Sequence, residues 1–167
     1  MADDTKEELE GETPKQRINR ELIELLNEVR VALPGVQVLF AFLLTVPFAA
    51  GWEKTTELQK DVYVCAVVTA AIAAVFMIAP SSYHRLLFRQ PHKEHMLMTS
   101  NKLLIIGMVF LALSICLCVF LVVDYVISIP WALTLTAVVA VMMIVLWYLM
   151  PLNRRHEVWP PHEASRD

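Results

Sequence analysis

The chain has 167 residues, of which 57% are hydrophobic and 19% are charged, and its formal net charge is −3. An ordinary soluble domain is about 45–50% apolar and about 25% charged, and its helices rarely run for twenty residues without a charge on one face. This composition excludes a typical soluble protein, and the negative net charge gives no electrostatic footprint for nucleic acid. The sequence therefore predicts an all-α integral membrane protein with the lipid bilayer as its first partner.

The first segments of the chain are polar or amphipathic. Residues 1–16 are acidic, and we expect them to form a disordered tail. Residues 17–33 carry apolar side chains at helical spacing, including Leu22, Leu25 and Val29, with glutamates and arginines on the other face. This pattern predicts an amphipathic helix that either lies in the membrane interface or packs against protein. Pro34 and Gly35 then predict a turn into the first span.

Four apolar segments follow, and each is close to the 20 or so residues that a helix needs to cross the hydrocarbon core. We expect spans at about 34–52, 62–80, 103–126 and 131–150, followed by a polar tail at 152–167. The short connection between the third and fourth spans requires an antiparallel hairpin. Small residues at four-residue steps, such as Ala66 and Ala70, predict close packing in a four-helix bundle.

The distribution of basic residues predicts the orientation. If the N-terminus, the central connection and the C-terminus share one side, only Lys54 and Lys60 of the 14 lysines and arginines fall on the other side. Basic residues accumulate on the cytoplasmic side of membrane proteins. We therefore predict a multi-pass protein of the cell (inner or plasma) membrane with both termini in the cytoplasm.

Three polar or helix-disrupting residues in or beside the spans are candidates for a transport path or a gate. Gln37 near the inner boundary of the first span could line a polar path or form a hydrogen bond between helices. Pro47 is predicted to kink the same helix. Asp124, at the outer end of the third span, could bind a cation or proton, could be a hydrated residue at the helix end, or could pair with Lys54 or Lys60. Gln37 and Thr45 are expected to mark the inward face of the first span.

A fourth candidate, at the inner end of the second span, combines His84 with Arg85. Imidazole titrates near neutral pH, so His84 could act as a pH sensor, whereas both side chains could equally anchor the helix at the interface. The spacing of His92 and His95 without a third nearby ligand does not predict a metal site. No nucleophile–base arrangement or phosphate-binding glycine loop can be assembled, so we expect neither enzymatic activity nor a cofactor.

Two stretches resemble a known family. Residues 21–48 read ELIELLNEVRVALPGVQVLFAFLLTVPF, and residues 79–89 read APSSYHRLLFR. Together they are similar to a family of small bacterial four-span membrane proteins of unknown function, sometimes labelled sodium:proton antiporters, over roughly residues 17–151. The resemblance implies a membrane protein but carries no functional residues. Ion-coupled exchange generally places ionisable groups near the midplane, and this chain has none there.

The sequence thus favours a non-enzymatic membrane protein that acts through association, either with itself as a homo-oligomer or with a larger membrane complex. The alternative is a proton- or cation-conducting oligomer, in which Gln37, Pro47 and Asp124 lie along the path and His84 acts as the inner sensor. Conduction that depends on Asp124 or His84 would separate the two.

Overall fold

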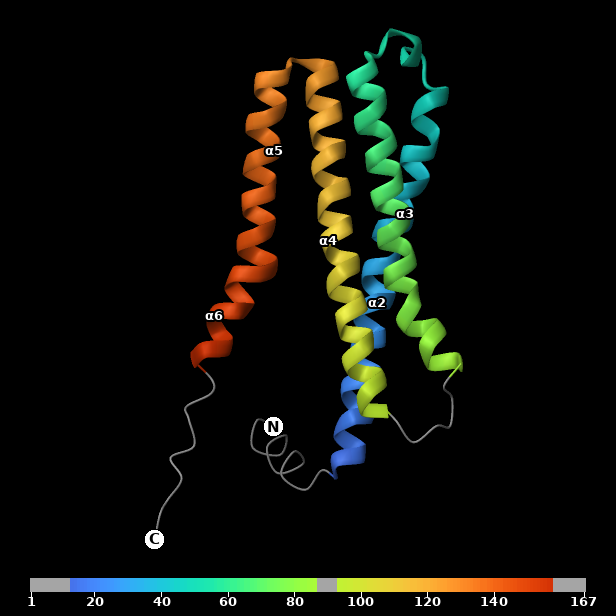
Figure 1. Ribbon diagram of the computed structural model, residues 1–167, viewed down its shortest axis with the longest axis vertical. Helices are drawn as coiled ribbons and strands as arrows, with labels where there is room; N and C mark the ends of the chain where they lie inside the picture. The colour runs from blue at the N-terminus through green and yellow to red at the C-terminus, as the bar shows by residue number, and fades with distance from the viewer. Residues whose placement is uncertain (1–12, 87–92, 158–167) are drawn as a thin grey trace.

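The protein is entirely helical in the computed structural model, which describes residues 13–86 and 93–157. Three long helices and a fourth, segmented one make up the fold (Figure 1). In chain order the elements are α2 (Pro14–Thr45), η1 (Val46–Phe48), η2 (Trp52–Lys54), α3 (Glu57–Leu86), α4 (Lys93–Val126), α5 (Ile129–Ile144), η3 (Val145–Leu149) and α6 (Met150–Glu157). Of the tails predicted at residues 1–16 and 152–167, residues 1–12 and 158–167 lie outside the described residues, as does His92. The described remainder corrects the prediction, because residues 14–16 begin α2 and residues 152–157 belong to α6.

The helices run up and down between two ends of the molecule (Figure 1). We call the end that holds the start of α2, the end of α3 and the start of α4 the inner end, after the predicted orientation. The turns between α2 and α3 and between α4 and α5 form the outer end. Four helical segments are long and apolar enough to cross a membrane, at Gln16–Phe48, Glu57–Leu86, His95–Val126 and Ile129–Asn153. They confirm the predicted all-α architecture, and their apolar surfaces suggest a lipid bilayer.

The first helix corrects the prediction of a separate amphipathic helix. α2 begins at Pro14 and continues without a break through Pro34 and Gly35 to Thr45. Pro34 removes one backbone hydrogen bond, but Val29 and Val36 on either side of it are both buried in the same apolar cluster. Packing against the neighbouring helices holds the two halves in line, so tertiary contacts override the local turn signal.

The apolar stripe of residues 17–33 packs against protein. Leu25 and Val29 belong to a buried cluster with Ala73 and Met77 of α3 and Leu104 of α4. Val36 is the remaining buried member of this inner cluster. The partly buried residues that pack against the cluster are Leu33, Ala74, Leu97, Phe110 and Leu111. On the opposite face of α2, Arg17 pairs with Glu21 and Arg20 with Glu24 at N–O distances of 2.9 and 3.1 Å. Of the two interpretations of this stripe, the structure supports packing against protein.

The second helix is also longer than predicted. Pro80 was expected to end the second span, yet it lies buried inside α3, which continues to Leu86. α3 contacts both α2 and α4. One third (33%) of its membrane-length window is buried, compared with 6% for the segment that contains α5. A proline in a membrane helix is tolerated where neighbouring helices enclose it.

Close contact between α3 and α4 depends on Gly107. A Cβ atom added at this position would lie 2.9 Å from Met77 Cγ, 3.2 Å from Phe76 Cβ and 3.4 Å from the carbonyl oxygen of Ala73. The rings of Phe76 and Phe110 stack beside it with centroids 6.0 Å apart. Ala66 and Ala70 on α3 are fully buried, as the predicted small-residue stripe requires.

The fourth helix packs against one neighbour. Among the described residues, α5 contacts α4 but neither α2 nor α3, and it diverges from α4 toward the inner end (Figure 1). The predicted hairpin with α4 is confirmed, whereas the fourth side of the bundle is left open. A π-helical turn (η3) follows, in which the N–H of Met150 bonds to the carbonyl of Val145. Pro151 comes directly after this turn, and α6 extends to Glu157.

Candidate functional site

The most highly connected polar cluster lies at the outer end, where α3 begins and α4 ends. Thr56 and Gln59 form a capping box: the Thr56 N–H donates to Gln59 Oε1 at 3.0 Å, and the Gln59 N–H donates to Thr56 Oγ1 at 3.3 Å. The same glutamine donates from Nε2 to Asp124 Oδ2 at 3.0 Å. The side chain of Gln59 thus joins the start of α3 to the carboxylate near the end of α4, and this residue is only 7% exposed.

Asp124 therefore has a different partner from the predicted ones. The structure pairs its carboxylate with the neutral amide of Gln59, whereas Lys60 pairs with Glu57 at 2.8 Å. A hydrogen bond to a carboxylate is stronger than one between neutral groups. The arrangement links two helices and leaves the carboxylate partly exposed.

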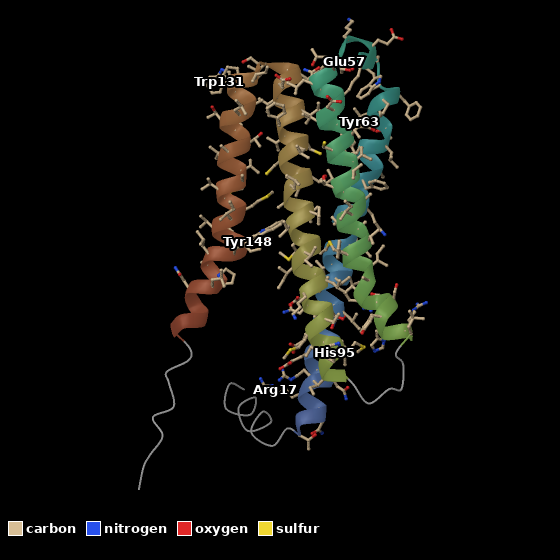
Figure 2. The ribbon with its side chains drawn as sticks, in the orientation of Figure 1. Arg17, Glu57, Tyr63, His95, Trp131 and Tyr148 are labelled. Atoms are coloured by element: carbon tan, nitrogen blue, oxygen red, sulfur yellow. The ribbon has the colours of Figure 1, made fainter. Side chains whose placement is uncertain are left out.

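Pro47 is also placed differently from the prediction. α2 ends at Thr45, and Pro47 lies in the 3₁₀ turn that follows, so it terminates the helix rather than kinking it. Proline has no N–H, and the carbonyl of Leu43 therefore lacks its usual donor four residues ahead. The N–H of Val46 and the hydroxyl of Tyr63, at 3.0 Å, donate to this carbonyl instead. Tyr63 is 8% exposed and is labelled in Figure 2.

This arrangement predicts energetic coupling between Tyr63 and Pro47. Tyr63→Phe removes a buried hydroxyl donor, and we expect it to lower the free energy of unfolding by about 1 kcal/mol. In a Pro47→Ala background the new N–H can serve the Leu43 carbonyl, so the same change should cost less than half as much. A double-mutant cycle by chemical unfolding in detergent micelles measures the difference. Equal costs in both backgrounds would contradict the proposed exchange of donors.

The turn beside this cluster is closely packed. Gly51 has a φ of 112°, which favours glycine, and a Cβ there would meet Tyr125 Oη at 2.7 Å. Trp52 contacts Tyr63 edge to face with ring centroids 4.9 Å apart. Aromatic residues with polar tips are frequent at membrane–water boundaries. Contacts from α2, α3 and α4 thus meet at the outer end, where the turn and the end of α4 also leave a half-open apolar pocket of about 190 Å³.

Polar groups near the middle of the helices bond within the chain. Ser114 of α4 is fully buried and donates from Oγ to the carbonyl of Ala66 on α3 at 2.9 Å. Thr69 donates to the carbonyls of Cys65 and Ala66 at 2.7 and 3.0 Å. The bond from Ser114 connects α4 to α3, whereas Thr69 bonds within α3.

Gln37 of α2 does not face the neighbouring helices, contrary to the prediction. Both Gln37 and Thr45 are exposed on the surface of the chain, so the prediction that they mark the inward face of α2 is wrong. The inward face instead carries Leu22, Leu25, Val29, Val36 and Leu43. Gln37 follows Val36 directly, and one helical residue is a rotation of about 100°, which turns its side chain away from α3 and α4.

The last predicted pair, His84 and Arg85, lies at the inner end in the final turn of α3, with His84 half-buried and Arg85 exposed. Asp124 and Pro47 lie at the opposite end of the molecule (Figure 1). The structure therefore does not gather the five candidate residues at one place. Within the described residues, no three histidine, cysteine, aspartate or glutamate side chains are grouped to hold a metal ion.

Two residues that the sequence analysis did not single out, Gln59 and Tyr63, organise the outer end. The spacing of Thr56 and Gln59 matches the capping-box pattern, and this signal alone could have placed Gln59 at a helix start. Nothing in the local sequence indicates the bond from Gln59 to Asp124, which is 65 residues away. The contact of Tyr63 with Leu43 depends in the same way on the packing of α3 against α2.

Comparisons with known proteins place the chain in a family and no further. Searches of curated proteins and of solved structures found no match. The sequence pattern of one protein family matches residues 11–151, which is most of the chain. That family has no known function, so the match carries no antiport activity with it. The protein belongs to the family of unknown function DUF6328.

Proposed function

We propose that this protein is a non-enzymatic four-span membrane protein that acts by associating with a second copy of itself through α5. The observation that carries the proposal is the isolated position of α5, which among the long helices of the described part of the chain contacts α4 alone. We call the exposed face of α5, on the side away from α4, its outer face. This face has a shallow hollow, which is lined by Thr134, Ala137, Val138, Val141, Met142, Val145 and Leu146. Membrane helices associate through van der Waals packing of such surfaces, and small residues allow their backbones to approach.

The polar contacts support association more than transport by one chain. The hydroxyls of Tyr63, Thr69 and Ser114 each bond to a backbone carbonyl, and the amide of Gln59 bonds to Asp124. An ion path generally places ionisable groups or free carbonyls near the midplane. These side chains stabilise contacts within α2, α3 and α4, which then act as a rigid support for α5.

A matched pair of variants tests the proposal. Val138 on α5 and Val75 on α3 are both apolar and similarly exposed, at 60% and 67%. The protein is labelled with donor and acceptor dyes, and energy transfer is followed as the vesicle lipid is increased. We expect Val138→Trp to shift the dissociation midpoint about tenfold toward higher protein density, because a bulky ring disrupts close packing. Val75→Trp should leave the midpoint unchanged.

One result would contradict self-association: energy transfer no greater than that of a monomeric membrane protein at every lipid ratio, together with recovery of an isolated monomer after mild detergent extraction. A different result would contradict association as the whole of the function. Ion flux in proteoliposomes, above that of empty vesicles, that Asp124→Asn or His84→Ala abolishes would make conduction by the associated chains the working function.

A further inference from the structure

The structure contains a second surface feature, a half-open groove on the side that α5 does not close. Its volume is about 540 Å³, within the range of about 300–1,000 Å³ that is usual for small-molecule sites. The walls come from α2, α3 and α4, and Trp147 of the π-helical turn forms the boundary on the side of α5. The lining residues are Glu28, Val29, Ala32, Gly35, Val36, Leu39, Met77, Asn101, Leu104, Ile105, Met108, Leu111, Ile115 and Trp147.

The groove is polar at one end and apolar along the rest of its length. Glu28, midway along α2, and Asn101 of α4 lie at the end of the groove that is nearer the inner end of the molecule, and the lining continues outward through apolar residues to Leu39 and Ile115. At about 1.5 Å per helical residue, these two walls span roughly 16 and 21 Å. One leaflet of a hydrocarbon core that is about 30 Å thick measures roughly 15 Å. The groove therefore has the length and polarity gradient of one lipid molecule in the leaflet at the inner end.

The charge at the inner end of the groove indicates the headgroup. Glu21 and Glu24 on the same helix pair with Arg17 and Arg20, whereas within the described residues Glu28 forms no ion pair. A carboxylate accepts hydrogen bonds only, and Asn101 adds an amide oxygen that also accepts. A primary ammonium has three N–H donors to offer them, whereas a quaternary ammonium has none. Lys102, which follows Asn101, is exposed and adds a positive charge next to it.

We propose that this groove binds a phospholipid with a primary ammonium headgroup, with one acyl chain along α2 and α4 and its ammonium group at Glu28 and Asn101. Gly35 keeps the groove open, since a Cβ at this position would meet nothing within 4 Å. Trp147 contacts the acyl chain of the lipid from the side of α5. The site is separate from the outer face of α5, so it does not depend on self-association.

Native mass spectrometry tests the proposal with the full-length protein and three lipids in separate titrations: phosphatidylethanolamine, phosphatidylcholine and phosphatidylglycerol. We expect phosphatidylethanolamine to bind with about tenfold higher affinity than the other two. Glu28→Gln should reduce its affinity to that of phosphatidylcholine, because the amide lacks the charge that attracts an ammonium group. Glu24→Gln is the matched control, since Glu24 is already paired and does not line the groove.

A second variant tests the groove itself. Gly35→Trp should fill it and abolish the preference for phosphatidylethanolamine while the protein remains folded, as judged by its helical circular dichroism. Val138→Trp, on the outer face of α5, should leave the lipid preference intact even if it disrupts self-association. Equal affinity for the three lipids, or a preference that survives both Glu28→Gln and Gly35→Trp, would overturn the proposal.

Discussion

Gly107→Leu is expected to lower the free energy of unfolding by about 2–3 kcal/mol, because the adjacent surface of α3 leaves no room for a side chain on α4. Even a single Cβ would lie 2.9 Å from Met77 Cγ and 3.4 Å from a backbone oxygen that cannot rotate away. α3 and α4 must therefore separate, and the inner apolar cluster, which contains Ala73, Met77 and Leu104, loses contacts. Chemical unfolding in detergent micelles, followed by circular dichroism, measures the change.

Gly35 provides the matched control for this prediction. It also lies inside a long helix, but a Cβ there would meet nothing within 4 Å. Gly35→Ala should raise the free energy of unfolding by up to about 1 kcal/mol, because alanine loses less conformational freedom than glycine on folding. Gly107→Ala gains the same advantage but must push Met77 aside, so its net effect should be a loss. A Gly107→Leu variant as stable as wild type would show that the α3–α4 contact is looser than these distances indicate.

The four membrane-length helices could be predicted from the sequence because burial in lipid requires long apolar segments, and composition alone reveals them. Their ends could not be predicted so well, for a reason shared by Pro34 and Pro80. Each proline was taken as the end of a segment, yet each lies inside a helix that continues past it. Buried side chains lie on both sides of Pro34, and Pro80 is itself buried, so tertiary contacts outweigh the weak signal of local propensity.

The candidate site was only partly predictable. Asp124 was singled out as a charged residue at a helix end, with a bound cation or proton, hydration, or a lysine partner as the alternatives. The observed partner is an uncharged amide from a distant part of the chain. Gln37 was expected to face inward because it is polar in an apolar segment. The orientation of α2 instead follows its apolar stripe from Leu22 to Leu43, which places Gln37 on the exposed surface.

The contact between Gln59 and Asp124 leads to the second large effect. Gln59→Leu should lower the free energy of unfolding by about 2–4 kcal/mol, since it removes a hydrogen bond to a carboxylate and half of the capping box of α3. Asp124 would keep its charge without the Nε2 donor at 3.0 Å. Asp124→Asn retains an acceptor oxygen for Gln59, so it should cost less than about 1 kcal/mol. Both values come from unfolding in detergent micelles.

Gln59→Glu separates the two contributions. Glutamate at this position retains the oxygen that accepts the Thr56 N–H, and therefore retains the cap, but it places a second carboxylate next to Asp124. We expect a loss at neutral pH that diminishes on acidification, because two adjacent carboxylates repel each other and protonation of one of them removes the repulsion. The double variant Gln59→Glu with Asp124→Asn exchanges the amide and the carboxylate across the same contact. It should recover most of the lost stability at neutral pH, whereas no recovery would assign the loss to the helix cap instead of the bond between α3 and α4.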